Sequence, residues 1–205
     1  MLELSTNLGL PLETEVNFES FGTQPLRFAR VRAYASSDTF DIKPIGELVR
    51  RYLRQSTVSI DPFARNKCWA TYTNDLNPKT EAEYHLDSAD FLEKLVAEAV
   101  QADLVLFDPP YSVSQTKECY ESIGLTLGME DVWRTSGWKR ERKAIRRLVK
   151  VGGYVISCNW NTNGIGGYYG FKPIELLDVC CGWGHNDFLV LVEQKIAHQM
   201  EMEGF

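Results

Sequence analysis

Short apolar runs, each about as long as a β-strand, alternate along this chain with segments of helical spacing. Helices are expected at Lys43–Leu53, where a proline stands in the first turn, and at Ala89–Ala99 and Asp131–Val149. Strands are expected at Thr57–Ile60, Thr71–Thr73, Tyr84–Leu86, Leu104–Phe107, Tyr154–Cys158, Leu176–Cys180 and Phe188–Val192. This alternation predicts an α/β protein with a mainly parallel sheet covered on both faces.

The two ends of the chain depart from this alternation. Only residues 181–187 separate the last two runs, which is too short for a helical crossover, so these strands are expected to be antiparallel neighbours. The first part of the chain has weak periodicity, several turn signals and one strand-like run at Phe28–Tyr34. We therefore expect an N-terminal arm over residues 1–39 and a single domain over residues 40–205.

Composition excludes several classes of protein. The chain has 205 residues, of which 44% are hydrophobic and 24% charged, as in ordinary globular domains. No apolar stretch has the length of a membrane span and no signal peptide is evident, so we expect a cytoplasmic protein without a membrane partner. Five cysteines and three scattered histidines, without a Cys-x-x-Cys pair, predict reduced thiols and no metal site.

The run Leu104–Phe107 ends directly in Asp108-Pro109-Pro110-Tyr111. Two prolines can continue neither a sheet ladder nor a helix, and neither of them has an N–H group. Such a turn offers hydrogen-bond acceptors at fixed positions beside an aromatic ring, which suits a planar ligand that carries an amino group. The ordinary alternative is a strand that ends in a proline turn with a tyrosine in the core.

Acidic residues follow four successive predicted strands, at Asp61, Asp75, Asp87 and Asp108. In an open α/β sheet, ligands bind beyond the carboxyl ends of the strands. Carboxylates there can accept hydrogen bonds from ribose hydroxyls and from an adenine amino group. The chain lacks the glycine-rich motifs that bind nucleotide phosphates, so a nucleoside cofactor without phosphate fits better. Any one of the four can instead be a simple turn residue.

Together, these residues resemble motifs I to IV of S-adenosylmethionine-dependent amino methyltransferases, most closely the small phage and prophage DNA N6-adenine methyltransferases. The resemblance extends from about Phe40 to Val192 and is carried by Asp61-Pro62-Phe63, Asp75, Asp87 and Asp108-Pro109-Pro110-Tyr111. It implies the Rossmann-like class I methyltransferase fold. That fold has a seven-stranded, mostly parallel sheet of order 3-2-1-4-5-7-6, with one antiparallel strand and helices on both faces.

The resemblance also implies a set of site residues. Asp108, Pro109, Pro110 and Tyr111 correspond to the catalytic motif, in which the Asp side chain and the first Pro carbonyl accept the target amino group and the ring stacks on the base. The residues that correspond to the S-adenosylmethionine site, which needs no metal, are Phe40, Lys43, Asp61, Phe63, Ala64, Arg65, Asn66, Asp75, Leu76, Asp87 and Ser88.

One motif departs from the family pattern. The family usually continues its first motif with two glycines, whereas this chain has Ala64-Arg65-Asn66. Two outcomes follow. Either Asn66 takes the left-handed conformation that glycine would supply, which is our expectation, or the loop holds the cofactor weakly or not at all.

The expected macromolecular partner is DNA. The net charge is −6, but Lys139, Arg140, Arg142, Lys143, Arg146, Arg147 and Lys150 form a basic group that predicts either a solvated helix face or a phosphate-binding stripe. The residues expected to contact the substrate are Ser112, Asn159, Trp160, Lys139 and Arg140, with Trp183 in a second aromatic loop. No separate target-recognition domain fits in the chain, so a homodimer or an accessory protein is a source of further contacts.

The sequence leaves three functions open. The first is methyl transfer to N6 of a flipped adenine in DNA, which uses positioning and electrostatics without a covalent intermediate. The second is methylation of an amino group on an RNA base. The third is a catalytically silent methyltransferase fold that serves as a binding module.

Overall fold

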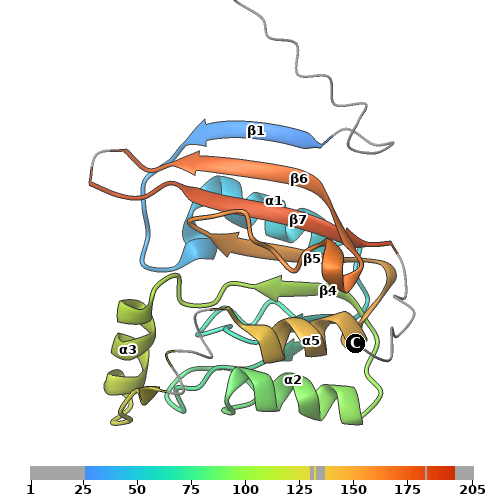
Figure 1. The fold of residues 1–205 in the computed structure, drawn as a ribbon. Coiled ribbons are helices and arrows are strands. Elements are labelled where there is room, and N and C mark those ends of the chain that lie inside the picture. The colour runs from blue at the N-terminus through green and yellow to red at the C-terminus, as the bar shows by residue number, and fades with distance from the viewer. Residues whose placement is uncertain (1–25, 130–131, 133–136, 183, 197–205) are drawn as a thin grey trace, which may run out of the picture.

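A computed structural model describes residues 26–129, 132, 137–182 and 184–196 (Figure 1). Within them lie seven strands, four α-helices and two 3-10 helices. The strands are β1 (Arg27–Arg32), β2 (Ser59–Asp61), β3 (Tyr72–Thr73), β4 (Ala102–Phe107), β5 (Val149–Asn159), β6 (Phe171–Cys180) and β7 (Phe188–Lys195). The helices are η2 (Thr39–Asp41), α1 (Lys43–Leu53), α2 (Ser88–Ala97), α3 (Val113–Ser122), α5 (Lys139–Leu148) and η3 (Gly167–Tyr169).

All seven strands form one sheet of order β1-β6-β7-β5-β4-β2-β3. β7 is antiparallel to both of its neighbours, and every other pair is parallel. The run from β3 to β6 reproduces the predicted order 2-1-4-5-7-6, with the late hairpin inserted as expected. The predicted fold class is confirmed.

The two edges of the sheet differ in detail from the prediction. The expected third strand at Tyr84–Leu86 is only a single parallel bridge between Asn74 and Tyr84. The seventh strand is instead β1, which pairs in parallel with β6 at the opposite edge. The strand-like run seen at Phe28–Tyr34 therefore joins the sheet. Tyr84–Leu86 does not extend into a ladder because side-chain hydrogen bonds from Asn74 occupy the backbone of Leu86.

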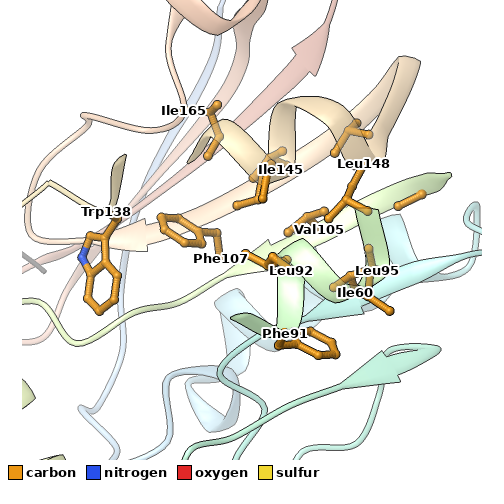
Figure 2. Close-up of a cluster of buried hydrophobic side chains, with 14 of the residues drawn as sticks. Ile60, Phe91, Leu92, Leu95, Val105, Phe107, Trp138, Ile145, Leu148 and Ile165 are labelled. Carbon is orange, nitrogen blue, oxygen red and sulfur yellow. The ribbon is translucent and has the colours of Figure 1, made fainter. Parts of the chain in front are cut away.

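β4 organises both hydrophobic cores, because its side chains alternate between the two faces of the sheet. Val105 and Phe107 belong to the core that α2 and α5 cover, together with Leu92 and Ile145 (Figure 2). Leu104 and Leu106 belong to the opposite core, which α1 covers with residues such as Ile45 and Val49. Coverage of both faces is thus as predicted.

The helix expected at Asp131–Val149 is shorter in the described part of the chain. It begins at Lys139, directly after Trp138, whose backbone has the left-handed φ of 50°. β5 follows at once from Val149, earlier than the expected start at Tyr154. Of the expected range, residues 131 and 133–136 lie outside the described residues, as does Trp183. No described helix is long and apolar enough to cross a membrane.

Asn74 fixes the loops at the carboxyl ends of the outer strands. The residue is 1% exposed, and its side-chain amide nitrogen donates to the carbonyls of Pro62 (3.2 Å) and Leu86 (3.0 Å). Its amide oxygen accepts from Leu86 N at 2.9 Å. One buried amide therefore holds the loop after β2 and the segment that leads into α2. Buried hydrogen-bond networks of this kind are costly to break.

Replacing Asn74 with alanine should destabilise the protein by about 2–4 kcal/mol, because it leaves up to three backbone groups without their partner. Urea denaturation measures this difference. Asn163→Ala, at an exposed position, is the matched control and should change stability by less than about 0.5 kcal/mol. Equal stability of the two variants would contradict the role given to Asn74.

Candidate functional site

A cleft opens at the carboxyl ends of β2, β3 and β4, where the chain order reverses: β3 lies outward from β2, while β5 lies outward from β4. Such a switch point is the usual ligand site of an open α/β sheet. The cleft consists of a cavity of about 450 Å³ and an adjoining one of about 80 Å³. Both are lined by Phe63, Asp75, Leu76, Pro110 and Cys119, so they form one continuous site.

Asp61, at the end of β2, is completely buried. Its Oδ1 accepts from the backbone N–H of Phe63 at 3.0 Å, whereas Oδ2 has no hydrogen-bond partner among the described residues. Burial raises the pKa of this carboxyl well above its ordinary value, and the nearby Asp108 and Asp75 carboxylates act in the same direction. A buried acceptor without a partner is a group that a hydrogen-bond donor on a ligand can satisfy.

The loop after β2 turns without glycine. The left-handed residue is Arg65, with φ of 50°, and not Asn66 as expected. The side chain of Asn66 instead accepts from Glu81 N at 3.1 Å, which ties it to another loop. Around the turn, Ala64 N donates to the carbonyl of Asn74 (2.9 Å) and Arg65 N to Asp75 Oδ2 (3.2 Å).

Three of the expected cofactor residues line the cleft but also have structural partners. The other oxygen of Asp75, Oδ1, accepts from Asn77 N at 2.8 Å. Asp87 caps α2 by accepting from Ala89 N at 3.0 Å. Ser88 is buried and donates to Glu141 Oε1 at 3.0 Å. Asp87 and Ser88 line only the smaller cavity, whereas Asp75 and Leu76 line both cavities.

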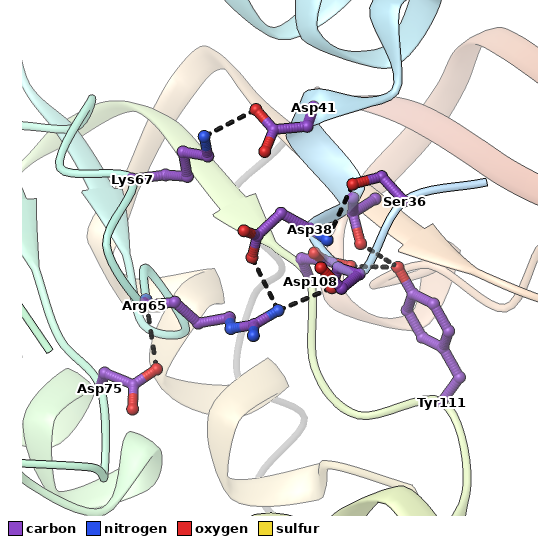
Figure 3. Close-up of polar contacts among 10 residues, drawn as sticks. Ser36, Asp38, Asp41, Arg65, Lys67, Asp75, Asp108 and Tyr111 are labelled. Carbon is purple, nitrogen blue, oxygen red and sulfur yellow. Dashed lines mark hydrogen bonds and ion pairs between the residues drawn. The ribbon is translucent and has the colours of Figure 1, made fainter. Parts of the chain in front are cut away.

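Asp108 and Tyr111 contact each other in the larger cavity (Figure 3). The Tyr111 hydroxyl donates a short hydrogen bond to Asp108 Oδ1, and it also lies 2.9 Å from the Thr39 hydroxyl. Burial raises the pKa of Asp108 to about 6, although hydrogen bonds from Tyr111 and Thr39 and the charge of Arg65 partly oppose this. Burial and the Asp108 charge also raise the pKa of Tyr111, which stays protonated. The carboxylate is therefore present as an acceptor, but Tyr111 occupies it.

The rest of the Asp-Pro-Pro-Tyr turn is held by α3. Ser112 caps this helix by accepting from Gln115 N at 3.2 Å, and Gln115 Oε1 accepts from Tyr111 N at 2.7 Å. Pro109 and Pro110 both line the cleft. The side chain of Ser112, which was expected to contact the substrate, thus caps α3 instead.

An aromatic wall adjoins Tyr111. Its ring centroid lies 5.5 Å from that of Trp160 and 5.8 Å from that of Phe188. Trp160 remains 38% exposed, and Asn159 Oδ1 accepts its backbone N–H at 2.6 Å. The loop after β5 therefore reaches the Asp-Pro-Pro-Tyr turn, as the sequence analysis expected.

Ten expected site residues do not line either cavity. Six of them have been described above: Asp61, Ala64, Asn66, Ser112, Asn159 and Trp160. The other four are Phe40, Lys43, Lys139 and Arg140. Phe40 is buried and stacks on Trp69 with centroids 5.8 Å apart. Lys43 has an 87% exposed side chain on α1. On α5, Lys139 is exposed, and Arg140 forms ion pairs with Asp90 (2.9 Å) and Glu93 (3.1 Å) of α2.

Several lining residues carry no recognisable signal in the sequence. They are Ser37, Thr39, Asn77, Thr80, Gln115, Glu118, Cys119 and Ser122 in the larger cavity, and Thr116, Tyr120 and Trp138 in the smaller one. Isolated polar residues of this kind come from different elements, so only the tertiary fold brings them to the cleft. Among the described residues, no group of three His, Cys, Asp or Glu side chains could hold a metal ion.

Comparison with known proteins adds little beyond the fold. No family model and no curated protein match the chain. Similar solved structures include SMU.776, complexed with SAH (11% identity, TM-score 0.46, 72% of this chain and 48% of that one). NSun6 from Pyrococcus horikoshii is 13% identical, with a TM-score of 0.47 over 72% of this chain and 50% of that one. The N-methyltransferase NodS from Bradyrhizobium japonicum is 10% identical, with a TM-score of 0.48 over 78% of this chain and 89% of that one. The chain spans about half the length of the first two. Likenesses of this size leave its activity open.

The raised pKa of Asp108 makes a prediction about stability. Because the folded-state pKa of about 6 lies above the ordinary 3.8, ionisation disfavours folding, and this cost develops as pH rises from about 4 to about 6. Asp108→Asn should therefore match the parent protein at pH 4 and exceed its unfolding free energy by about 1–3 kcal/mol at pH 7. Urea titrations at both pH values measure this.

Glu83→Gln, at an exposed carboxylate, serves as the control and should show no such pH-dependent gain. A lower stability of Asp108→Asn at pH 7 would contradict the burial argument.

Proposed function

We propose that this chain is an S-adenosylmethionine-dependent methyltransferase that acts on the N6 amino group of adenine in DNA. The observation that carries the proposal is the position of Asp108. Its carboxylate stands at the end of the central strand β4, in the same cavity as Asp75 and beside the buried Asp61. An acceptor for an amino group and a carboxylate suited to a ribose thus share one cleft.

The residues at the cleft fit the cofactor. Asp75 would accept from the ribose hydroxyls, since each of its oxygens accepts only one backbone N–H at present. Asp87 and Ser88 border the smaller cavity, which Phe63 and Trp138 line with apolar surface suited to adenine. The unpartnered Asp61 Oδ2 supports the presence of a polar ligand nearby. When bound, the cofactor would supply a methyl group on a positively charged sulfur.

Asp108 has a clear role in this reaction. The lone pair of an exocyclic amine is delocalised into the base, so the nitrogen is a poor nucleophile. A hydrogen bond from that amine to the Asp108 carboxylate would favour a tetrahedral nitrogen and stabilise the developing positive charge. The amine must first displace the Tyr111 hydroxyl, which occupies Oδ1. The freed Tyr111 ring, with Trp160 beside it, offers a stacking surface worth about 1–3 kcal/mol for a flipped base.

DNA is favoured over other amine substrates by two features near the cleft. One is the aromatic wall of Tyr111, Trp160 and Phe188, which suits a base removed from its stack. The other is α5, where Lys139, Lys143 and Arg147 follow one another at a spacing of one helical turn. These three side chains are exposed, and none of them is in an ion pair with another described residue. α5 begins directly after Trp138, which lines the smaller cavity, so this basic stripe starts at the edge of the cleft.

Transfer of a tritiated methyl group from S-adenosylmethionine to unmethylated duplex DNA and to RNA, followed by nucleoside analysis, tests the proposal. We expect label in N6-methyldeoxyadenosine. Asp108→Ala should lower transfer by about 100-fold or more while cofactor affinity changes by less than about fivefold. Glu98→Ala, beyond the end of α2, is the control and should keep full activity.

Three outcomes would contradict parts of this proposal. Label in RNA alone would assign the substrate to RNA. Full transfer by Asp108→Ala would remove the mechanism. No measurable binding of the cofactor would leave a methyltransferase fold that serves another purpose.

A triple variant with Lys139, Lys143 and Arg147 changed to glutamine tests the basic stripe. DNA affinity should fall, and the slope of log affinity against log salt should become shallower by about 2–3, since each lost phosphate contact contributes about 0.9. Fluorescence anisotropy at several salt concentrations measures the slope.

The matched control is a triple variant at cations on other elements, Arg32, Arg54 and Lys172. It removes the same charge but should leave the slope unchanged. The same loss of slope in both variants would mean that net charge matters and the stripe does not.

A further inference from the structure

The larger cavity is lined by more acidic than basic side chains. Asp75, Asp108 and Glu118 contribute carboxylates, while Arg65 is the only cationic residue among the described residues that line it. A ligand that carries both positive groups and a carboxylate would find many partners for its cations and a single one for its anion. Any carboxylate bound in this cavity is therefore directed to Arg65.

Arg65 reaches across the mouth of the cleft to a segment far from it in the sequence (Figure 3). Its Nη1 lies 2.7 Å from Asp38 Oδ1 and donates to the carbonyl of Ser37 at 2.7 Å. The guanidinium also acts on the cavity, because its charge opposes the rise in the pKa of Asp108. The Arg65 side chain thus lies between the loop after β2 and the Ser37–Thr39 segment, close enough to interact electrostatically with Asp108.

The backbone of Arg65 indicates that this placement is held by its surroundings. A left-handed φ of 50° is uncommon for a residue with a β-carbon. The conformation is fixed by the hydrogen bond from Arg65 N to Asp75 and by the neighbouring bond from Ala64 N to Asn74. A turn that glycine would make without strain therefore carries a guanidinium at the cleft mouth.

The Arg65–Asp38 ion pair is easy to exchange. The side chains are 55% and 31% exposed, and ion pairs at such positions contribute little to stability. A carboxylate on a ligand can replace Asp38 at little cost. Asp38 then returns to solvent.

We propose that Arg65 binds the α-carboxylate at the amino-acid end of the cofactor, and that Asp38 is a built-in competitor which occupies Arg65 in the ligand-free protein. This inference rests on the proposed function. It also explains how the loop can hold the cofactor without glycines. Where a glycine turn would contact the cofactor through its backbone, Arg65 would donate a charged hydrogen bond from its side chain. The inference predicts opposite effects on affinity for the two partners of one ion pair.

Isothermal titration with two ligands tests this inference. S-adenosylhomocysteine carries the amino-acid end, while 5′-methylthioadenosine has the same nucleoside and sulfur without it. Arg65→Gln should weaken S-adenosylhomocysteine by about tenfold or more and leave 5′-methylthioadenosine unchanged. Asp38→Asn should strengthen S-adenosylhomocysteine by about two- to fivefold, again without effect on 5′-methylthioadenosine.

Lys67→Gln is the matched control. Lys67 is a second cation of the same loop, but it pairs with Asp41 at 2.6 Å and does not line the larger cavity. Its replacement should change neither affinity. Arg65→Lys, which keeps a charge without the planar fork, should fall between the parent protein and Arg65→Gln.

The outcomes separate this inference from the proposed function. If the parent protein binds neither ligand, the proposed function fails and this inference with it. If it binds both, and Arg65→Gln weakens both equally, Arg65 only ties two loops together and the inference alone is overturned. Weaker binding of S-adenosylhomocysteine by Asp38→Asn would overturn the competition.

Discussion

The structure depends on one strand that is buried on both faces and must end abruptly. β4 supplies Val105 and Phe107 to one core and Leu104 and Leu106 to the other, so its position in the sheet is fixed from both sides. Pro109 and Pro110 cannot extend it, because they lack the N–H groups that a ladder needs. Asp108 is therefore placed at the carboxyl edge of the sheet with little freedom, and its neighbours are arranged around a rigid point.

Buried polar groups connect this point to the outer loops. Asn74 joins the loop after β2 to the segment before α2, and Asp75 fixes the turn at Arg65. Asp61 and Asp108 are held where ionisation is unfavourable, and both have raised pKa values. Burial of these two carboxyls reduces the stability of the protein, but it provides the cleft with preorganised acceptors. This pattern is typical of functional sites.

Two charged groups of the ligand-free cleft have partners within the protein. Tyr111 donates to Asp108, and Asp38 pairs with Arg65. In each case a side chain of the protein stands where the proposed ligands have a matching group: an amine at Asp108 and a carboxylate at Arg65. Ligand binding is then an exchange of partners rather than the filling of an empty space, which limits the desolvation cost of keeping charged groups in a cavity.

The sequence by itself determined the alternation of strands and helices and the position of Asp108 at the end of a strand, because periodicity and proline chemistry are local. The sheet order from β3 to β6 was implied only by the resemblance to a known family. The sequence did not determine that β1 would complete the sheet or that Tyr84 would form only a bridge, since edge pairing depends on which backbone groups remain free. Only the tertiary structure placed Arg65, rather than Asn66, in the left-handed turn and brought Thr39, Gln115 and Asp38 to the cleft. Those contacts join distant segments, and their geometry follows from packing that no local pattern encodes.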